Sequence, residues 1–222
     1  MKYIYIITIL LLFSFNVLDI SSKSYSITYM EKEKLNLKDA ENPVIPERFR
    51  EDFKKMMIKE SKKNTFFTLN YSNNKSLYKF DRVENLPEKS VVHYVDFYKD
   101  FTKKEIYVTG GMIGDAAIKE TFSKWIYQKD TSNILGYDCQ KAILIQKNND
   151  TLTAWYASDI PIFDGPEHYA GLPGLILKYE TNRKTVTATD ITEITNENFK
   201  VEIPEFKNFI NEKEFRNKIT PK

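Results

Sequence analysis

The chain is poor in the residues on which several functional classes depend. It has one cysteine, Cys139, among 222 residues, so an intrachain disulfide is impossible and the fold must be stabilised by its core. Lys+Arg 33 against Asp+Glu 31 leave a formal charge of +2 without a long block of one sign, which excludes the basic surface typical of a nucleic-acid binder. No phosphate-binding loop, Cys-x-x-Cys pair or Ser–His–Asp order is present. We therefore expect no cofactor.

Apolar residues are plentiful by contrast. Hydrophobic residues make up 41% of the chain and aromatic residues 14%, which is enough apolar surface to form a core. A length of about 200 residues after any targeting segment fits one domain. We interpret residues 23–222 as that single domain.

The N-terminus has the pattern of a secretory signal peptide. Lys2 precedes the apolar stretch Tyr3–Phe15, and small residues follow at Ser21 and Ser22. Asn16 and Asp19 interrupt the apolar run, so residues 1–22 predict a cleaved signal peptide rather than a membrane anchor. No later segment is apolar enough to span a membrane. We expect a periplasmic or secreted protein without stable membrane insertion after cleavage.

Short alternating segments dominate the mature chain. Residues 24–30 place Tyr and Ile on one face and Ser and Thr on the other, and about nine further β-rich runs follow, joined mostly by Asn, Asp or Gly turns. An apolar stripe at helical spacing after Pro46 predicts a helix over residues 46–63 that covers the sheet, and residues from Pro204 suggest a short C-terminal helix. The predicted class is α+β, mainly β, with a strongly curved antiparallel sheet; an open half-barrel, by analogy with periplasmic lipoprotein carriers, is the favoured form.

Glycine and proline residues, which favour turns, are concentrated between residues 136 and 177. Gly165-Pro166 and Gly171-Leu-Pro-Gly-Leu-Ile176 read as structural turns, with Pro173 and Gly174 suited to a type II turn. The six residues 171–176 carry the signature of the GLPGLI family of exported Bacteroidota proteins, and the chain resembles that family over roughly residues 65–194. Flanking residues around Gly136, Cys139, Trp155 and Pro161 agree in order and spacing. The resemblance implies export and a bacterial source, but no catalytic residue.

Three groups of side chains in this region are candidate sites. Aromatic residues bracket the turn-rich loop and suit an apolar ligand or extended peptide, although they also suit a plug at one end of the sheet. Cys139 is a candidate reactive thiol with Lys141 on its face, and a small buried hydrophobe otherwise. Acidic residues and a histidine in the loop 159–168 are candidate metal ligands, or else ordinary turn residues. The aromatic group is Trp155, Tyr156, Phe163 and Tyr169, and the metal group is Asp164, Glu167 and His168.

These observations favour a non-enzymatic exported binding protein that holds an apolar ligand or extended peptide near residues 155–177. One alternative is a thiol- or metal-dependent hydrolase that uses Cys139 or the loop 159–168. Another is an interaction subunit that binds an outer-membrane protein through a sheet edge.

Overall fold

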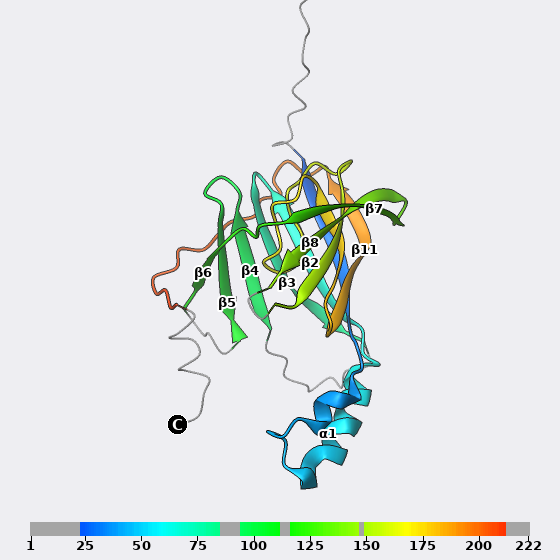
Figure 1. The fold of residues 1–222 in the computed structure, drawn as a ribbon. Coiled ribbons are helices and arrows are strands. Elements are labelled where there is room, and N and C mark those ends of the chain that lie inside the picture. Colours follow the sequence, from blue (N-terminus) through cyan, green and yellow to red (C-terminus); the bar gives the residue numbers. More distant parts are fainter. Residues whose placement is uncertain (1–22, 85–93, 112–115, 147–148, 212–222) are drawn as a thin grey trace, which may run out of the picture.

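The computed structural model describes residues 23–84, 94–111, 116–146 and 149–211. It contains one unclosed antiparallel sheet of eleven strands in the order β6-β5-β4-β3-β2-β1-β11-β10-β9-β8-β7 (Figure 1). The mainly β prediction is confirmed. The strands are β1 (Ser24–Glu33), β2 (Thr65–Ser72), β3 (Lys75–Val83), β4 (Val95–Asp100), β5 (Glu105–Gly110), β6 (Ile118–Thr121), β7 (Ile126–Ile134), β8 (Tyr137–Ile145), β9 (Thr151–Ala157), β10 (Leu175–Glu180) and β11 (Lys184–Ile194).

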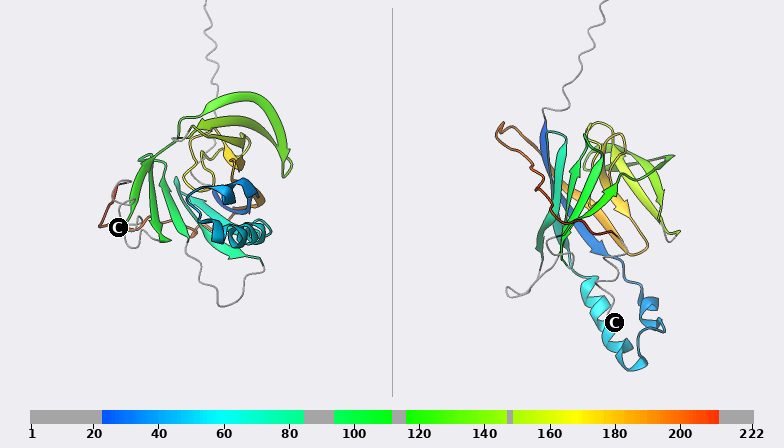
Figure 2. Two further views of the ribbon diagram at one scale, coloured as in Figure 1. Left: turned by 60° about the horizontal axis from the view of Figure 1, so that its bottom comes forward. Right: turned by 90° about the vertical axis from the view of Figure 1, so that its left-hand side faces the viewer.

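The chain connectivity explains why the sheet is strongly curved. The edge strands β6 and β7 follow each other in the chain, joined only by residues 122–125. A flat sheet of eleven strands would separate its edges by roughly 48 Å. Five extended residue steps span at most about 18 Å. The sheet must therefore bend back on itself, and Figure 2 shows the resulting concave interior.

Most strands predicted from alternation are present. The hairpin between β2 and β3 turns at Asn73 and Asn74, which both have positive φ, as the turn prediction requires. The predicted strand over residues 122–128 is shifted, because β7 begins at Ile126 and β6 precedes the linker. Residues 91–93 of another predicted strand, and the predicted signal peptide, lie outside the described residues.

The N-terminal helix is present but does not cover the sheet. Helix α1 (Glu47–Glu60) has no buried residue, and its main packing partner is the short 3-10 helix η2 (Leu37–Glu41). It projects beyond the end of the sheet in Figure 1. Phe49 and Met56 of its apolar stripe stay about half exposed. The predicted covering role is not confirmed, because the chain fills the concave face in another way, described below.

The C-terminal segment also differs from the prediction. Residues 204–211 form neither a helix nor a strand, apart from one parallel bridge between Phe209 and Ala117. Phe206 stacks on Tyr107 of β5 at 5.2 Å between ring centroids. No helix forms in this described part of the tail, since its aromatic residues pack onto the strands β4 and β5 instead.

Three tyrosines are the largest fully buried side chains of the described core. Tyr29, Tyr78 and Tyr179 are fully buried, and the Tyr29 hydroxyl donates a 2.7 Å hydrogen bond to the Ile176 carbonyl. Burial raises the pKa of all three phenols well above the ordinary value of 10. While the protein stays folded, these phenols therefore remain protonated at pH values where exposed tyrosines ionise.

This burial predicts a steep loss of stability at alkaline pH. Unfolded tyrosines release protons near pH 10 whereas Tyr29, Tyr78 and Tyr179 retain theirs, so stability is intact below about pH 10 and falls as pH rises further. We expect tyrosinate absorbance to increase in two stages, the second coinciding with loss of the circular dichroism signal. A smooth titration of all tyrosines with the fold intact would contradict this expectation.

Candidate functional site

The concave interior is filled by the chain itself. Residues 158–174, here called the plug segment, leave β9 and return to β10 through the space enclosed by the sheet (Figure 2). Ile160, Ile162 and Leu172 are almost completely buried in the common core. Ile176 N–H donates to the Asp164 carbonyl at 2.8 Å, and Leu175 N–H donates to the Ile160 carbonyl at 3.1 Å. The plug segment is thus hydrogen-bonded to the first residues of β10.

A buried ion pair joins the plug segment to the opposite wall. Lys99 of β4 and Asp164 have no exposed side-chain surface, and the Lys99 ammonium donates to the Asp164 carboxylate and the Gly165 carbonyl. Asp164 also accepts the Gly165 N–H at 2.7 Å. Burial lowers the pKa of Lys99, while Asp164 favours its charged form. The pair is a fixed internal link, since neither group reaches solvent.

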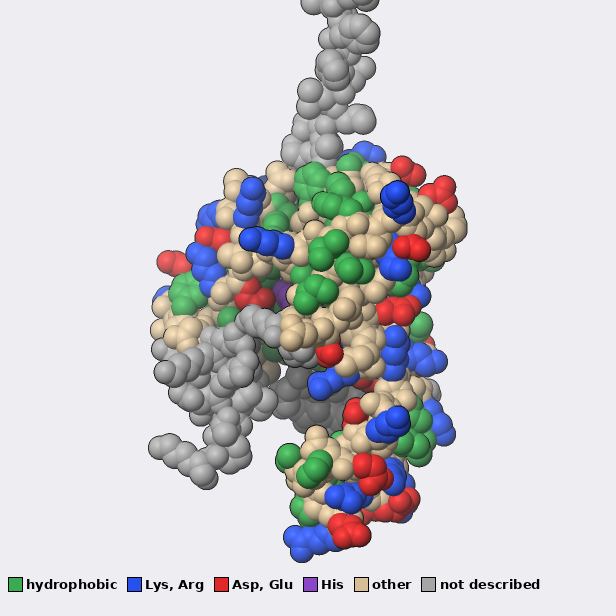
Figure 3. All heavy atoms as spheres, viewed as in Figure 1, with side chains coloured by type: hydrophobic (Ala, Val, Ile, Leu, Met, Phe, Trp, Pro, Cys, Tyr) green, Lys and Arg blue, Asp and Glu red, His purple; other side chains and the backbone are tan. Residues whose placement is uncertain are grey.

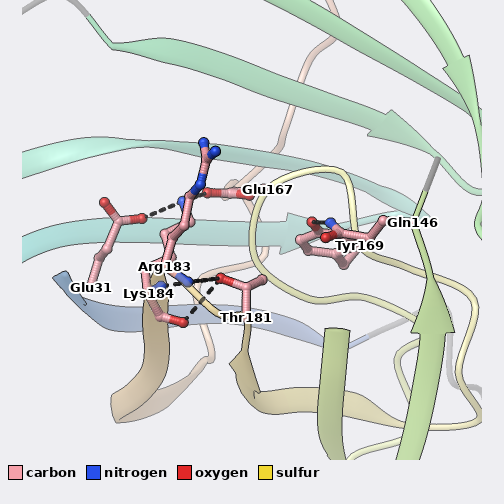
Figure 4. Close-up of polar contacts among 7 residues, drawn as sticks. All are labelled: Glu31, Gln146, Glu167, Tyr169, Thr181, Arg183 and Lys184. Atoms are coloured by element: carbon pink, nitrogen blue, oxygen red, sulfur yellow. Dashed lines mark hydrogen bonds and ion pairs between the residues drawn. The ribbon is translucent and has the colours of Figure 1, made fainter. Parts of the chain in front are cut away.

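A second charged cluster lies where the plug segment meets β1 and β11. The Lys184 ammonium donates to Glu31 at 2.7 Å and to Glu167 (Figure 4), and these side chains are 12–24% exposed. Burial raises the pKa of Glu31. Burial acts in the same direction on Glu167, but Lys184 and His168 outweigh it and leave the pKa of that carboxyl lowered. Glu167 adopts a positive φ of 54°, a conformation that this contact helps to hold.

Polar contacts on either side support this second cluster. The Thr181 hydroxyl accepts the N–H groups of Arg183 and Lys184, both at 3.1 Å, and so shapes the turn from β10 into β11. Gln146 donates to the Tyr169 hydroxyl at 3.2 Å, as Figure 4 shows. Together, the Lys99–Asp164 pair and the Lys184 cluster link the plug segment to strands of the sheet.

The four predicted ligand-binding aromatics do not form one surface. Tyr156 and Tyr169 are 2% and 4% exposed, and each hydroxyl contacts a glutamine, Gln140 and Gln146 respectively. Phe163 is 50% exposed. Trp155 points to the outer face of the sheet, where the Lys178 ammonium lies 5.0 Å from its ring centre. Alternation along β9 separates Trp155 from Tyr156, so neighbours in sequence face opposite sides.

Cys139 lies in a position that disfavours reaction. It is fully buried, and burial raises the pKa of its thiol to about 11. The Sγ atom lies 3.5 Å from the Tyr137 carbonyl, while Lys141 pairs with Asp130. A thiol with this pKa is almost entirely protonated at neutral pH, which matches the small buried hydrophobe weighed in the sequence.

The candidate metal ligands are also engaged elsewhere. Asp164 pairs with Lys99, Glu167 pairs with Lys184, and His168 packs on Tyr169 with ring centroids 4.2 Å apart. Among the described residues, no three His, Cys, Asp or Glu side chains are gathered to hold a metal ion. The second histidine, His93, lies outside those residues.

The turn glycines and prolines hold the plug segment in place. Gly171 and Gly174 have positive φ of 96° and 150°. Gly165 packs so closely on Ile176 that a Cβ would lie 2.7 Å from the Ile176 Cβ. Pro166 is buried beside it, and Pro173 is exposed. The type II turn predicted at residues 172–175 lacks the expected hydrogen bond from the Leu175 N–H to the Leu172 carbonyl. The Leu172 carbonyl accepts the Gly174 N–H instead, and the Leu175 N–H donates to the Ile160 carbonyl.

A solvent-accessible hollow whose lining includes Lys178, two residues after the signature, lies on the outer face. A groove of about 360 Å³ crosses β1, β11 and β10. Met30, Thr187 and Lys178 are paired across these strands, and the pairing continues from Lys178 to Trp155 on β9. We call this surface, with Trp155 at its border, the outer groove. It is lined by Met30, Lys32, Glu33, Lys34, Lys178, Glu180, Thr185 and Thr187.

One family model matches a part of the chain that borders this site. Residues 144–178 match the family described as "Protein of unknown function (Porph_ging)". The match supports a family of the Bacteroidota type and covers β9, the plug segment and the first residues of β10. No curated protein matches the chain.

Two solved structures share the fold at low identity. The structures titled "Structure of PNGF-II in P21 space group" and "Structure of PNGF-II in C2 space group" each align with TM-score 0.54, at 19% and 17% identity, over 89% of this chain. The chain spans about a third of their length, 33% and 32%. An uncharacterized conserved protein from Thermus thermophilus aligns with TM-score 0.41 and 5% identity, over 86% of this chain and 92% of that one. The PNGF-II likeness supports the fold alone.

Sequence reasoning missed the charged partners of the plug segment. Lys99 and Glu31 are far from it along the chain, Lys184 begins the second strand after it, and each resembles an ordinary polar strand residue. The available signal was strand alternation, which places them on the inward face, because Glu31 continues the series of Tyr25, Ile27 and Tyr29.

Within the described residues, no helix is both long and apolar enough to cross a lipid bilayer.

Proposed function

We propose that the chain is an exported, non-enzymatic binding protein that holds an extended peptide in the outer groove. The proposal includes cleavage after residue 22, a periplasmic or secreted location, and a place in the GLPGLI family on the strength of residues 171–176. The curved sheet serves as an open half-barrel whose interior is closed by the plug segment. The outer groove, open to solvent beside the family match, is the observation that carries the proposal.

The groove suits a peptide better than a sequestered apolar molecule. An apolar ligand requires an enclosed cavity. The plug segment and the core residues fill the concave side. The outer groove instead places Met30 and Trp155 among lysine, glutamate and threonine side chains, so it offers apolar contacts with hydrogen-bonding groups between them.

The groove presents both lysine and glutamate side chains, so it favours a ligand that carries both negatively and positively charged groups. Lys34 and Lys178 both pair with Glu180, at 3.4 Å and 2.5 Å. Lys178 additionally lies over the Trp155 ring, which holds the indole in place. The hydrolase alternative has weaker support, because Cys139 is protonated and buried and the loop carboxylates are ion-paired.

Native mass spectrometry of the mature protein, purified gently from its own host, tests this proposal. We expect an excess native mass that disappears on denaturation and that a peptide accounts for. Trp155→Ala should weaken rebinding of that peptide about tenfold or more, because an aromatic contact residue is lost. Phe163→Ala is the matched control, since this exposed aromatic belongs to the plug segment, whereas Trp155 is paired across the strands with Lys178 of the groove lining.

Two outcomes would count against the proposal. A bare monomer mass would exclude a tightly held peptide. Equal rebinding by Trp155→Ala and the native protein would place the ligand away from the outer groove.

A further inference from the structure

The Lys99–Asp164 ion pair is an unusual place for two charges. Figure 3 shows lysine, arginine and acidic side chains spread over one face of the molecule, where water solvates them. Lys99 of β4 and Asp164 of the plug segment have no exposed side-chain surface. Taking two ions out of water is costly, and their attraction offsets that cost only if their remaining hydrogen-bonding positions are also satisfied. The hydrogen bonds around the pair therefore determine how well it is stabilised.

These hydrogen bonds leave one carboxylate oxygen without a partner. The Lys99 ammonium donates to Asp164 Oδ1 and to the Gly165 carbonyl. Asp164 Oδ1 also accepts the Gly165 N–H at 2.7 Å. Asp164 Oδ2 is buried as well, but no described residue provides it with a hydrogen-bond partner. A carboxylate removed from water needs donors at both oxygens, so the ion pair is incompletely satisfied.

An amide formed from the two side chains fits the same surroundings better. A secondary amide has one N–H donor and one carbonyl acceptor. The Lys99 N–H keeps the Gly165 carbonyl as its acceptor, and Asp164 Oδ1, now the amide oxygen, keeps the Gly165 N–H as its donor. The atom lost on forming the amide is Oδ2, the oxygen without a partner. Condensation therefore removes both buried charges and the unsatisfied acceptor.

We propose that Lys99 and Asp164 condense in the folded protein to an isopeptide bond, which joins β4 covalently to the plug segment. The ammonium first passes a proton to the carboxylate, and the neutral amine attacks Cγ. The Nζ–Cγ bond forms and the Cγ–Oδ2 bond breaks. Oδ2 leaves as water with two of the three nitrogen protons, and the third stays on the amide. The two charges cancel, so the step needs no other reactant.

The position of the pair favours this reaction. The fold holds the amine and the carboxyl in contact, which makes the step intramolecular. Burial lowers the pKa of Lys99 and so favours the neutral amine, which is the nucleophilic form. The closed surroundings also keep bulk water from hydrolysing the amide. The same burial that makes the ion pair costly therefore promotes its conversion to an amide.

The Lys184 cluster provides an internal comparison. Its side chains are 12–24% exposed. Burial acts to lower the pKa of Lys184, but Glu167 and Glu31 outweigh it and leave that pKa raised. Lys184 therefore stays protonated and in contact with water, and we expect no amide between it and either carboxylate.

Mass spectrometry of the mature protein under denaturing conditions tests the proposal, with the N-terminus identified in a digest. We expect a mass lower than that of the sequence by one water molecule. A tryptic digest should contain residues 90–103 joined to residues 148–178, because trypsin does not cut after an acylated Lys99. Lys99→Met and Asp164→Ala should each show the full sequence mass and no joined segments. Lys79→Met, at an exposed position of β3, is the matched control and should retain the cross-link.

Two outcomes would overturn the proposal. One is a native chain with its full sequence mass and separate tryptic segments. The other is a water loss confined to residues 148–178 that persists in Lys99→Met, since attack of the Gly165 nitrogen on Asp164 Cγ forms a cyclic imide of the same mass. Because the digest of the native chain distinguishes a cross-link from an imide, the test does not depend on whether a variant folds.

Discussion

Replacing Lys99 by methionine is expected to lower the free energy of unfolding by about 3–5 kcal/mol, because the Asp164 carboxylate then stays buried without its cation. The Gly165 carbonyl loses the same donor. Since Asp164 is held by backbone bonds inside the plug segment, it cannot turn to solvent while the fold persists. Urea denaturation of Lys99→Met beside the native protein measures the difference.

Two variants sharpen this expectation. Lys99→Met combined with Asp164→Asn should recover part of the loss, because no unpaired charge remains and the amide oxygen can still accept the Gly165 N–H. Lys79→Met, at an exposed position on the neighbouring strand, should stay within about 0.5 kcal/mol of the native protein. A loss below about 1 kcal/mol for Lys99→Met would show that the pair does not hold the plug segment.

Alternation and turn chemistry made most of the sheet predictable from sequence. Tyr25, Ile27 and Tyr29 alternate with serine and threonine, and the structure buries that face. Asn73 and Asn74 identified a hairpin because the turn needs positive φ at both positions. These signals are local, so they do not depend on which strands become neighbours.

The site was less predictable because its contacts are not local. Lys99 and Asp164 are 65 residues apart, and a single lysine in a strand gives no sign that it will point inward. The stripe on α1 suggested a covering helix, yet the concave face was already filled by the plug segment. Gly165 was predicted as a structural turn residue, but nothing in the sequence indicated that it also allows close packing against Ile176 of the sheet.

Gly174→Ala is the second substitution with a large expected effect. It tests whether the 171–176 signature is required for the close packing of Gly174 on the backbone of β9. A Cβ at Gly174 would lie 2.2 Å from the Ala157 carbonyl oxygen and 2.6 Å from its carbon. Both are backbone atoms of β9, next to the point where β10 pairs with it at Ala157 and Leu175. We expect a loss of more than about 4 kcal/mol, or failure to fold, because strand and plug segment must both move.

Gly136→Ala separates the steric cause from the backbone cause. Gly136 also has a positive φ, 84°, but a Cβ there meets nothing within 4 Å. Its substitution should cost only about 1–2 kcal/mol, the penalty of a side chain in the left-handed region. Urea denaturation and refolding yield compare the two variants. Similar losses for both would mean that close packing does not require Gly174, whereas a much larger loss for Gly174→Ala would show that the signature preserves the junction between plug segment and sheet.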